Sequence, residues 1–227
     1  MLDKLPQYHS AQIGSRRPNT PRTFYLTMSL LMLALVTYAF SRTIGDGLLH
    51  TRRPHRFITL LSIHAAVFYV WMLFFVLQSA LVRWRNLRLH RLLGWFGTAD
   101  ALLVVLMGLW ATFVEPFPLA LESIGILSMA GFGIPVALAI LWRKRPAHHR
   151  RLLFIGTAVL TNAAFARLPG TYLPTHFFYA GTDLIVAIGI AHDLWTERRI
   201  HQVYRYAMPL LLAAQIAVLI RAWPYLG

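Results

Sequence analysis

The side chains best able to do chemistry in this sequence are its histidines. There are ten histidines and no cysteine, so metal ligation would rest on imidazole and carboxylate groups, while disulfides, thiolate nucleophiles, iron–sulfur clusters and covalent c-type haem are excluded. No pair of histidines has the H-x-x-x-H or H-E-x-x-H spacing that places two ligands on one helix face. A histidine site must therefore be assembled from segments that lie far apart in the sequence.

One histidine pattern occurs twice. Residues 90–98 read HRLLGWFGT and residues 149–157 read HRRLLFIGT, with H-R-x-L-x-x-x-G-T in common. Positions i, i+4, i+7 and i+8 of a helix share a face, so each histidine heads a stripe of small residues. The two stripes are His90, Gly94, Gly97 and Thr98, and His149, Gly156 and Thr157. The pattern indicates either a cap at headgroup level above a packing seam, or a histidine pair that binds haem b or a metal while the glycines make room.

A second group of polar side chains falls deep inside apolar segments. At about 1.5 Å per residue, each lies roughly 10 Å or more from the nearer membrane face. The group comprises His64, Asp100, Asn162 and Asp183, and Asp183 shares a helix face with His176. Ionisable groups at this depth are costly and usually face the bundle interior. We therefore expect a metal site formed by His64, Asp183 and His176, or a polar path through Asp100 and Asn162. The alternative is that these are structural groups that hold helices together.

The elements that must position these residues are membrane helices. Hydrophobic residues make up 57% of the 227 residues and charged residues only 13%, about half of what a soluble domain carries. Since a bilayer core needs about 20 apolar residues per helix, the sequence predicts an all-α polytopic fold, a bundle of seven transmembrane helices. The bundle spans 24–227 after a tail at 1–23, and its predicted spans are 24–41, 57–82, 93–114, 123–142, 152–168, 177–195 and 206–223.

The excess of basic residues gives an orientation. The chain carries a formal charge of +14, and sixteen of its 22 Lys and Arg fall in segments on one side of these spans. By the positive-inside rule this predicts a cytoplasmic N-terminus and an outer C-terminus. Both copies of the repeat then open helices at the inner face, so the repeat is parallel. The arginines occur in short bursts between apolar runs, so membrane insertion explains them better than nucleic-acid binding.

One outer loop departs from the charge rule. It contains Arg52, Arg53 and Arg56, which predict either contact with the phosphates of anionic lipids or a clamp for an anionic ligand such as a haem propionate.

Three stretches also carry a resemblance. Residues 64–97, with the H-R-x-L-G junction, and the later stretches HHRRLLFIGTAV at 148–159 and AHDLWTERRIH at 191–201 resemble a group of uncharacterised bacterial integral membrane proteins. The His-Arg helix openings are also similar to those of small membrane proteins implicated in cytochrome oxidase maturation, which have fewer helices. The first resemblance implies a multi-pass protein of the bacterial cytoplasmic membrane, and the second implies a role near respiratory enzymes.

Three functions remain open. The leading hypothesis is a membrane protein that binds haem b or a transition metal through histidines for respiratory or redox chemistry. The alternatives are an accessory subunit of a larger membrane complex, and a small transporter or proton-relay protein that uses Asp100 and Asp183. Retinal chemistry is excluded because both lysines, Lys4 and Lys144, lie outside the spans, and no P-loop is present.

Overall fold

The computed structural model describes residues 23–43, 55–114, 119–169, 172 and 177–225, and in this part of the chain every regular element is a helix. The predicted tail therefore lies outside the described residues, apart from residue 23. So do His176 and the outer-loop residues Arg52 and Arg53, and the side chain of Arg56 is likewise not described. The expectations placed on these residues remain predictions.

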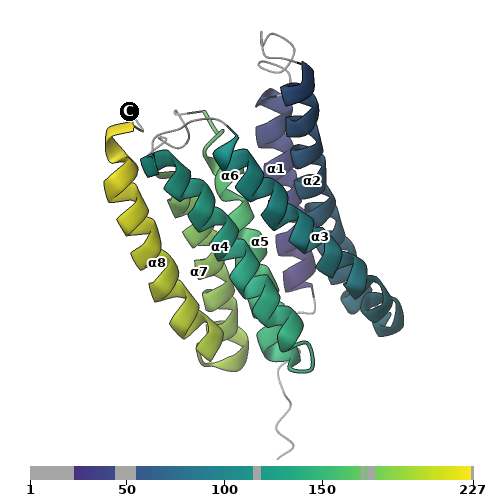
Figure 1. Cartoon of the computed structure of the whole chain (residues 1–227). Helices are drawn as coiled ribbons and strands as arrows, with labels where there is room; N and C mark the ends of the chain where they lie inside the picture. The colour runs from purple at the N-terminus through teal and green to yellow at the C-terminus, as the bar shows by residue number, and fades with distance from the viewer. Residues whose placement is uncertain (1–22, 44–54, 115–118, 170–171, 173–176, 226–227) are drawn as a thin grey trace, which may run out of the picture.

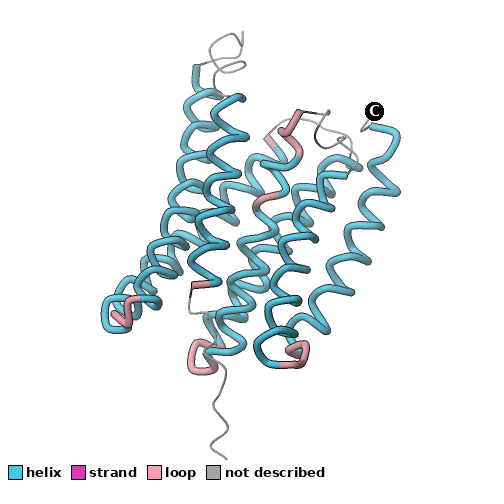
Figure 2. The backbone as a smooth tube through the Cα atoms, turned by 180° about the vertical axis from the view of Figure 1, so that it is seen from behind, coloured by secondary structure: helices cyan, strands magenta, loops and turns pink. Residues whose placement is uncertain are grey.

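The helices run up and down as a bundle (Figure 1). They are α1 (Phe24–Thr43), α2 (His55–Arg83), α3 (Leu87–Phe113), α4 (Leu119–Leu141), α5 (Pro146–Leu160), α6 (Asn162–Phe165), α7 (Phe178–Glu197) and α8 (Gln202–Ala222). Figure 2 shows the turns α2–α3, α4–α5 and α7–α8 at one end of the molecule. We call this the basic end, because ten exposed Arg and Lys residues lie in or beside these turns: Arg83, Arg85, Arg88, Arg91, Arg143, Lys144, Arg145, Arg198, Arg199 and Arg205.

Short-range signals set the helix boundaries at the basic end. The side chain of Asn86 accepts a hydrogen bond from the backbone N–H of Leu89 and caps α3. Pro146 opens α5, where its missing N–H costs no helical bond. Arg85 and Arg198 adopt the left-handed backbone conformation that commonly ends a helix, with φ of 62° and 57°.

Five of the helices are long and apolar enough to cross a membrane: Phe24–Ser41, Thr59–Arg83, Leu87–Phe113, Leu119–Leu141 and Gln202–Tyr225. Large aromatic side chains are exposed at both ends of the bundle, as at the interfaces of a bilayer. Trp84, Trp142, Trp195 and Tyr206 lie near the basic end, and Tyr172, Trp223 and Tyr225 near the opposite end. The predicted spans 152–168 and 177–195 correspond to α5 with α6 and to α7, which are shorter or more polar than the other five.

Helix α5 lies at the centre of the bundle. Every residue of this helix from Phe154 to Leu160 is buried, and it contacts α4, α7 and α8. Trp71 of α2 also donates a hydrogen bond from Nε1 to Thr157 Oγ1 over 3.2 Å. A helix enclosed on all sides by protein does not need the long apolar surface of a lipid-facing span. Its position also brings the second copy of the repeat against several other helices.

The glycines of the two repeats pack in the same way. A Cβ atom at Gly97 would overlap the ring of Phe74 on the preceding helix, α2. A Cβ at Gly156 would lie 3.1 Å from the backbone oxygen of Phe132 on its own preceding helix, α4. The two hairpins, α2–α3 and α4–α5, are therefore built alike, as small residues that allow close helix approach predict.

Candidate functional site

The structure brings together the two histidines of the repeat. His90 in α3 and His149 in α5 have ring centroids 6.4 Å apart and ring planes at 87°. Both side chains are partly buried and lie close to the basic end of the bundle. The repeat predicts equal depth for the two histidines. The structure also places their rings side by side, although they belong to two different hairpins.

The hydrogen bonds of the two rings determine which nitrogens are free. Nδ1 of His149 lies 2.8 Å from the backbone oxygen of Ala139, near the end of α4. A carbonyl can only accept, so Nδ1 carries the proton and Nε2 keeps its lone pair. Nδ1 of His90 is buried and has no hydrogen-bond partner among the described residues. Each ring therefore has one nitrogen available to a ligand, and a backbone carbonyl orients His149 as in many metal sites.

The glycines predicted to make room for a cofactor leave little space. Phe74 fills the space beside Gly97, and α4 packs against Gly156. Only at Gly94 would an added Cβ meet nothing within 4 Å. Helix packing therefore uses two of the three glycines, and only Gly94 has open space beside it.

The second predicted site is not brought together in the described residues. His64 Nδ1 lies 3.1 Å from the backbone oxygen of Met107 in α3, whereas Asp183 Oδ1 accepts a hydrogen bond of 3.0 Å from Gln215 in α8. The two side chains thus contact different helices. No group of three or more His, Asp or Glu residues suited to a metal ion occurs in the described part of the chain.

The residues of the predicted polar path also have separate surroundings. Asn162 Oδ1 accepts a hydrogen bond from Thr182 Oγ1, which links α6 to α7. Asp100 is 5% exposed, and its Oδ2 has no hydrogen-bond partner among the described residues. Asn162 therefore has a structural partner, and Asp100 stands out as a carboxyl without one.

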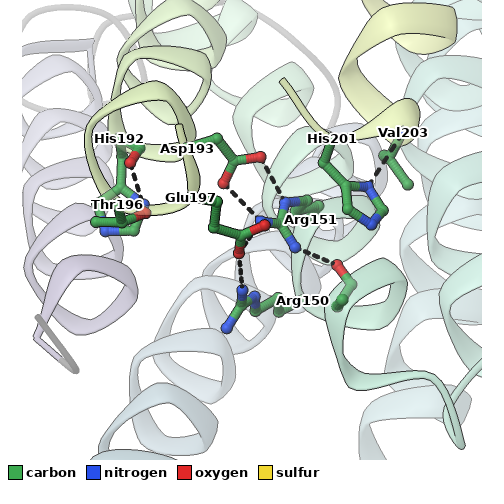
Figure 3. Close-up of polar contacts among 9 residues, drawn as sticks. Arg150, Arg151, His192, Asp193, Thr196, Glu197, His201 and Val203 are labelled. Atoms are coloured by element: carbon green, nitrogen blue, oxygen red, sulfur yellow. Dashed lines mark hydrogen bonds and ion pairs between the residues drawn. The ribbon is translucent and has the colours of Figure 1, made fainter. Parts of the chain in front are cut away.

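The residues that the sequence analysis missed form a buried charge network between α5 and α7 (Figure 3). Arg151 and Asp193 are 0% and 1% exposed, and two hydrogen bonds of 2.7 Å join them, from Nε to Oδ2 and from Nη2 to Oδ1. Arg151 Nη2 also bonds Glu197 at 2.6 Å, and Arg150 bonds the same carboxylate at 2.8 Å. Two cations and two anions thus neutralise one another at the start of the central helix.

Aromatic rings pack around this network. His192 stacks on Phe24 with centroids 3.9 Å apart, and Arg150 lies over the ring of Tyr25. Neither ring nitrogen of His192 has a hydrogen-bond partner in the described part of the chain, and the same holds for the hydroxyl of Tyr204. These rings connect α1 and α8 to the α5–α7 contact, so the network lies where four helices meet.

The network had a signal in the sequence. Asp193 and Glu197 are spaced i, i+4 on one helix face, where the predicted span 177–195 ends on the strongly basic side. Two acids aligned in a basic region predict an internal ion pair. The count of basic residues by loop treated Arg151 as one more exposed cation.

Acid should weaken the turn between α7 and α8. His201 caps α8 by accepting a hydrogen bond of 3.2 Å from the N–H of Val203 at Nδ1, which requires a neutral ring. Burial, and then the charges of Arg151 and His148, lower the pKa of His201 below its ordinary 6.5, although Asp193 and Glu197 oppose this. Since the unfolded chain then binds the proton first, this contribution to stability is fully present above pH 6.5 and is lost as the pH falls through the folded pKa.

Thermal unfolding of the full chain in detergent, followed between about pH 5 and 7.5, checks this expectation. His201→Asn keeps a cap and does not titrate, so its unfolding temperature should fall less toward acid than that of the wild type. Equal slopes for the two proteins would show that His201 does not titrate on unfolding. Glu197 does not contribute to the titration in this pH range. Its burial would raise the pKa of the carboxyl, but the hydrogen bond and charge of Arg151 outweigh the burial and lower that pKa.

Comparison of the chain with protein-family models, with curated proteins and with solved structures gives no match. The proposals that follow therefore rest on the residues and their geometry.

Proposed function

We propose that this chain is a seven-span protein of the bacterial cytoplasmic membrane, with its basic end in the cytoplasm, that binds a transition-metal ion through His90 and His149 for redox chemistry. The carrying observation is that two histidines from separate hairpins lie 6.4 Å apart, ring centroid to ring centroid. Each also has a free ring nitrogen. The charge of the basic end supports the orientation, and the aromatic residues at both ends support placement in a bilayer.

The distance between the two rings allows both histidines to bind one ion. With metal–nitrogen bonds of about 2.0–2.1 Å, two imidazoles on one ion have ring centroids about 5–6.5 Å apart. The observed separation is at the upper end of this range. Imidazole is a suitable ligand for copper, zinc, iron and nickel, so the residue type agrees with the geometry.

Haem b fits these residues less well than a single ion does. A macrocycle between the two rings needs open space on all sides, and the protein itself occupies that space beside Gly97 and Gly156. Binding of haem b is therefore the alternative result that the following test can reveal.

The test is the metal and haem content of the purified full chain. We expect about one transition-metal ion per chain after loading with copper, zinc or cobalt, and loss of that ion in His90→Ala and in His149→Ala. His64→Ala is the matched control, since His64 is also partly buried and also faces a backbone oxygen, that of Met107, but lies outside the repeat.

Two results would overturn this proposal. A wild-type chain that holds neither stoichiometric metal nor haem after loading would remove the metal site. Binding that survives both repeat-histidine variants and disappears in His64→Ala would move it elsewhere. A Soret band lost in the repeat-histidine variants would replace the ion by haem b at the same residues.

A further inference from the structure

Gln78 of α2 is a buried polar side chain near the end of its helix, toward the basic end of the bundle. It is 9% exposed, and both polar atoms of its amide, Oε1 and Nε2, have no hydrogen-bond partner among the described residues. A buried amide left without partners destabilises the folded chain. Such a group in an otherwise well-packed bundle points to a ligand that completes it.

The helix register places Gln78 level with His149. Helices α2 and α5 run in opposite directions (Figure 1), and Trp71 contacts Thr157 across them through a hydrogen bond. From that contact toward the basic end, Gln78 lies seven residues along α2 and His149 eight residues along α5, which is about 10 Å and about 12 Å at the rise of an α-helix. Gln78 also lies two turns from Trp71, on the same face.

Gln78 is close to His90 as well. The backbone carbonyl of Gln78 lies beside the His90 ring. Nδ1 of His90 is buried and has no hydrogen-bond partner among the described residues, so this nitrogen is available to a ligand. The Ala139 carbonyl holds Nδ1 of His149, so Nε2 of that ring remains for the ion. Three helices then contribute one free donor each.

From this juxtaposition we infer that Gln78 is the third ligand of the metal site and that the ion is monovalent copper. This inference rests on the proposed function. His90, His149 and Gln78 are all neutral ligands, so the bound ion keeps its full charge in a medium of low dielectric. The cost of burying an ion rises with the square of its charge, so a monovalent ion is favoured over a divalent one.

The ring separation favours the same ion. A centroid distance of 6.4 Å is reached only when the two nitrogens lie nearly opposite each other across the ion. Near-linear coordination by two nitrogens suits monovalent copper, whereas zinc in proteins is almost always tetrahedral. At copper sites made of two histidines and a cysteine, a glutamine oxygen can serve as a weak axial ligand, and Gln78 would take a comparable role beside the two histidines here.

The experiment measures the affinity of the full chain for monovalent copper without oxygen, by competition with a chromophoric copper(I) chelator. Wild type should bind one ion, Gln78→Leu should bind it about 10–100-fold more weakly, and Gln78→Met should stay near wild type because its thioether is a ligand for this ion. A merely structural role of Gln78 would make the leucine and methionine variants alike. Unfolding temperatures of both variants show that they are folded.

The outcomes separate this inference from the proposal beneath it. If wild type binds copper and Gln78→Leu binds it equally well, Gln78 is not a ligand while the histidine site stands. If wild type binds zinc more tightly than monovalent copper, the assignment of the ion is wrong while the site again stands. If wild type binds no metal, or if His149→Ala leaves binding unchanged, both the inference and the proposed function fall.

Discussion

Replacing Asp193 with leucine should lower the free energy of unfolding by about 3–5 kcal/mol, because it leaves a buried guanidinium without its main partner. Arg151 is 0% exposed, and Asp193 engages it through two hydrogen bonds of 2.7 Å. Glu197 remains in contact with Arg151, but it is 25% exposed and also bonds Arg150. The measurement is the unfolding of the purified chain in mixed micelles, compared with that of the wild type.

Two further variants show whether the loss comes from the unpaired charge. Glu197→Gln should cost clearly less, since water reaches that carboxylate and the Arg151–Asp193 pair remains intact. The double variant Arg151→Met with Asp193→Leu should recover most of the lost stability, because well-packed apolar residues often replace a buried ion pair without loss. If the double variant is as unstable as Asp193→Leu alone, the pair does more than neutralise charge, and the prediction's physical basis is wrong.

The helices themselves could be predicted from hydropathy and charge. Apolar runs of membrane length located the five long helices, because a lipid-facing helix needs such a run. The same rule gave its weakest signal for the span at 152–168, which is the central helix α5 followed by α6. A helix enclosed by protein carries arginine, threonine and asparagine that a lipid-facing helix would exclude, so hydropathy could not distinguish a central helix from a marginal span.

The candidate site was only half predictable. The repeat identified His90 and His149 as equivalent, and the structure places their rings next to each other. Gln78 lies on the same helix face as His64 within an apolar segment, and nothing local distinguishes it from a packing residue. Its proposed role as a ligand depends on the register of α2 against α5, which a contact such as that of Trp71 with Thr157 sets. Contacts of this kind join distant positions and leave no short-range pattern.

Asp100 should show the opposite behaviour from Asp193, with Asp100→Leu raising the free energy of unfolding by about 1–3 kcal/mol. Asp100 lies at the midpoint of α3, which runs from Leu87 to Phe113. Its side chain is 5% exposed, and Oδ2 has no hydrogen-bond partner among the described residues. A carboxyl in this position loses its hydration on folding and gains no bond in return, so an apolar replacement removes a cost.

The matched control is the other deep carboxyl, Asp183, which accepts a hydrogen bond of 3.0 Å from Gln215. Asp183→Leu would leave the buried amide of Gln215 without this partner, so it should destabilise the chain by about 1–3 kcal/mol under the same unfolding conditions. Two substitutions of the same kind are thus expected to have effects of opposite sign. A loss of stability in Asp100→Leu that Asp100→Asn does not share would mean that the site needs a polar group for structural reasons, and the physical basis of this prediction would be wrong.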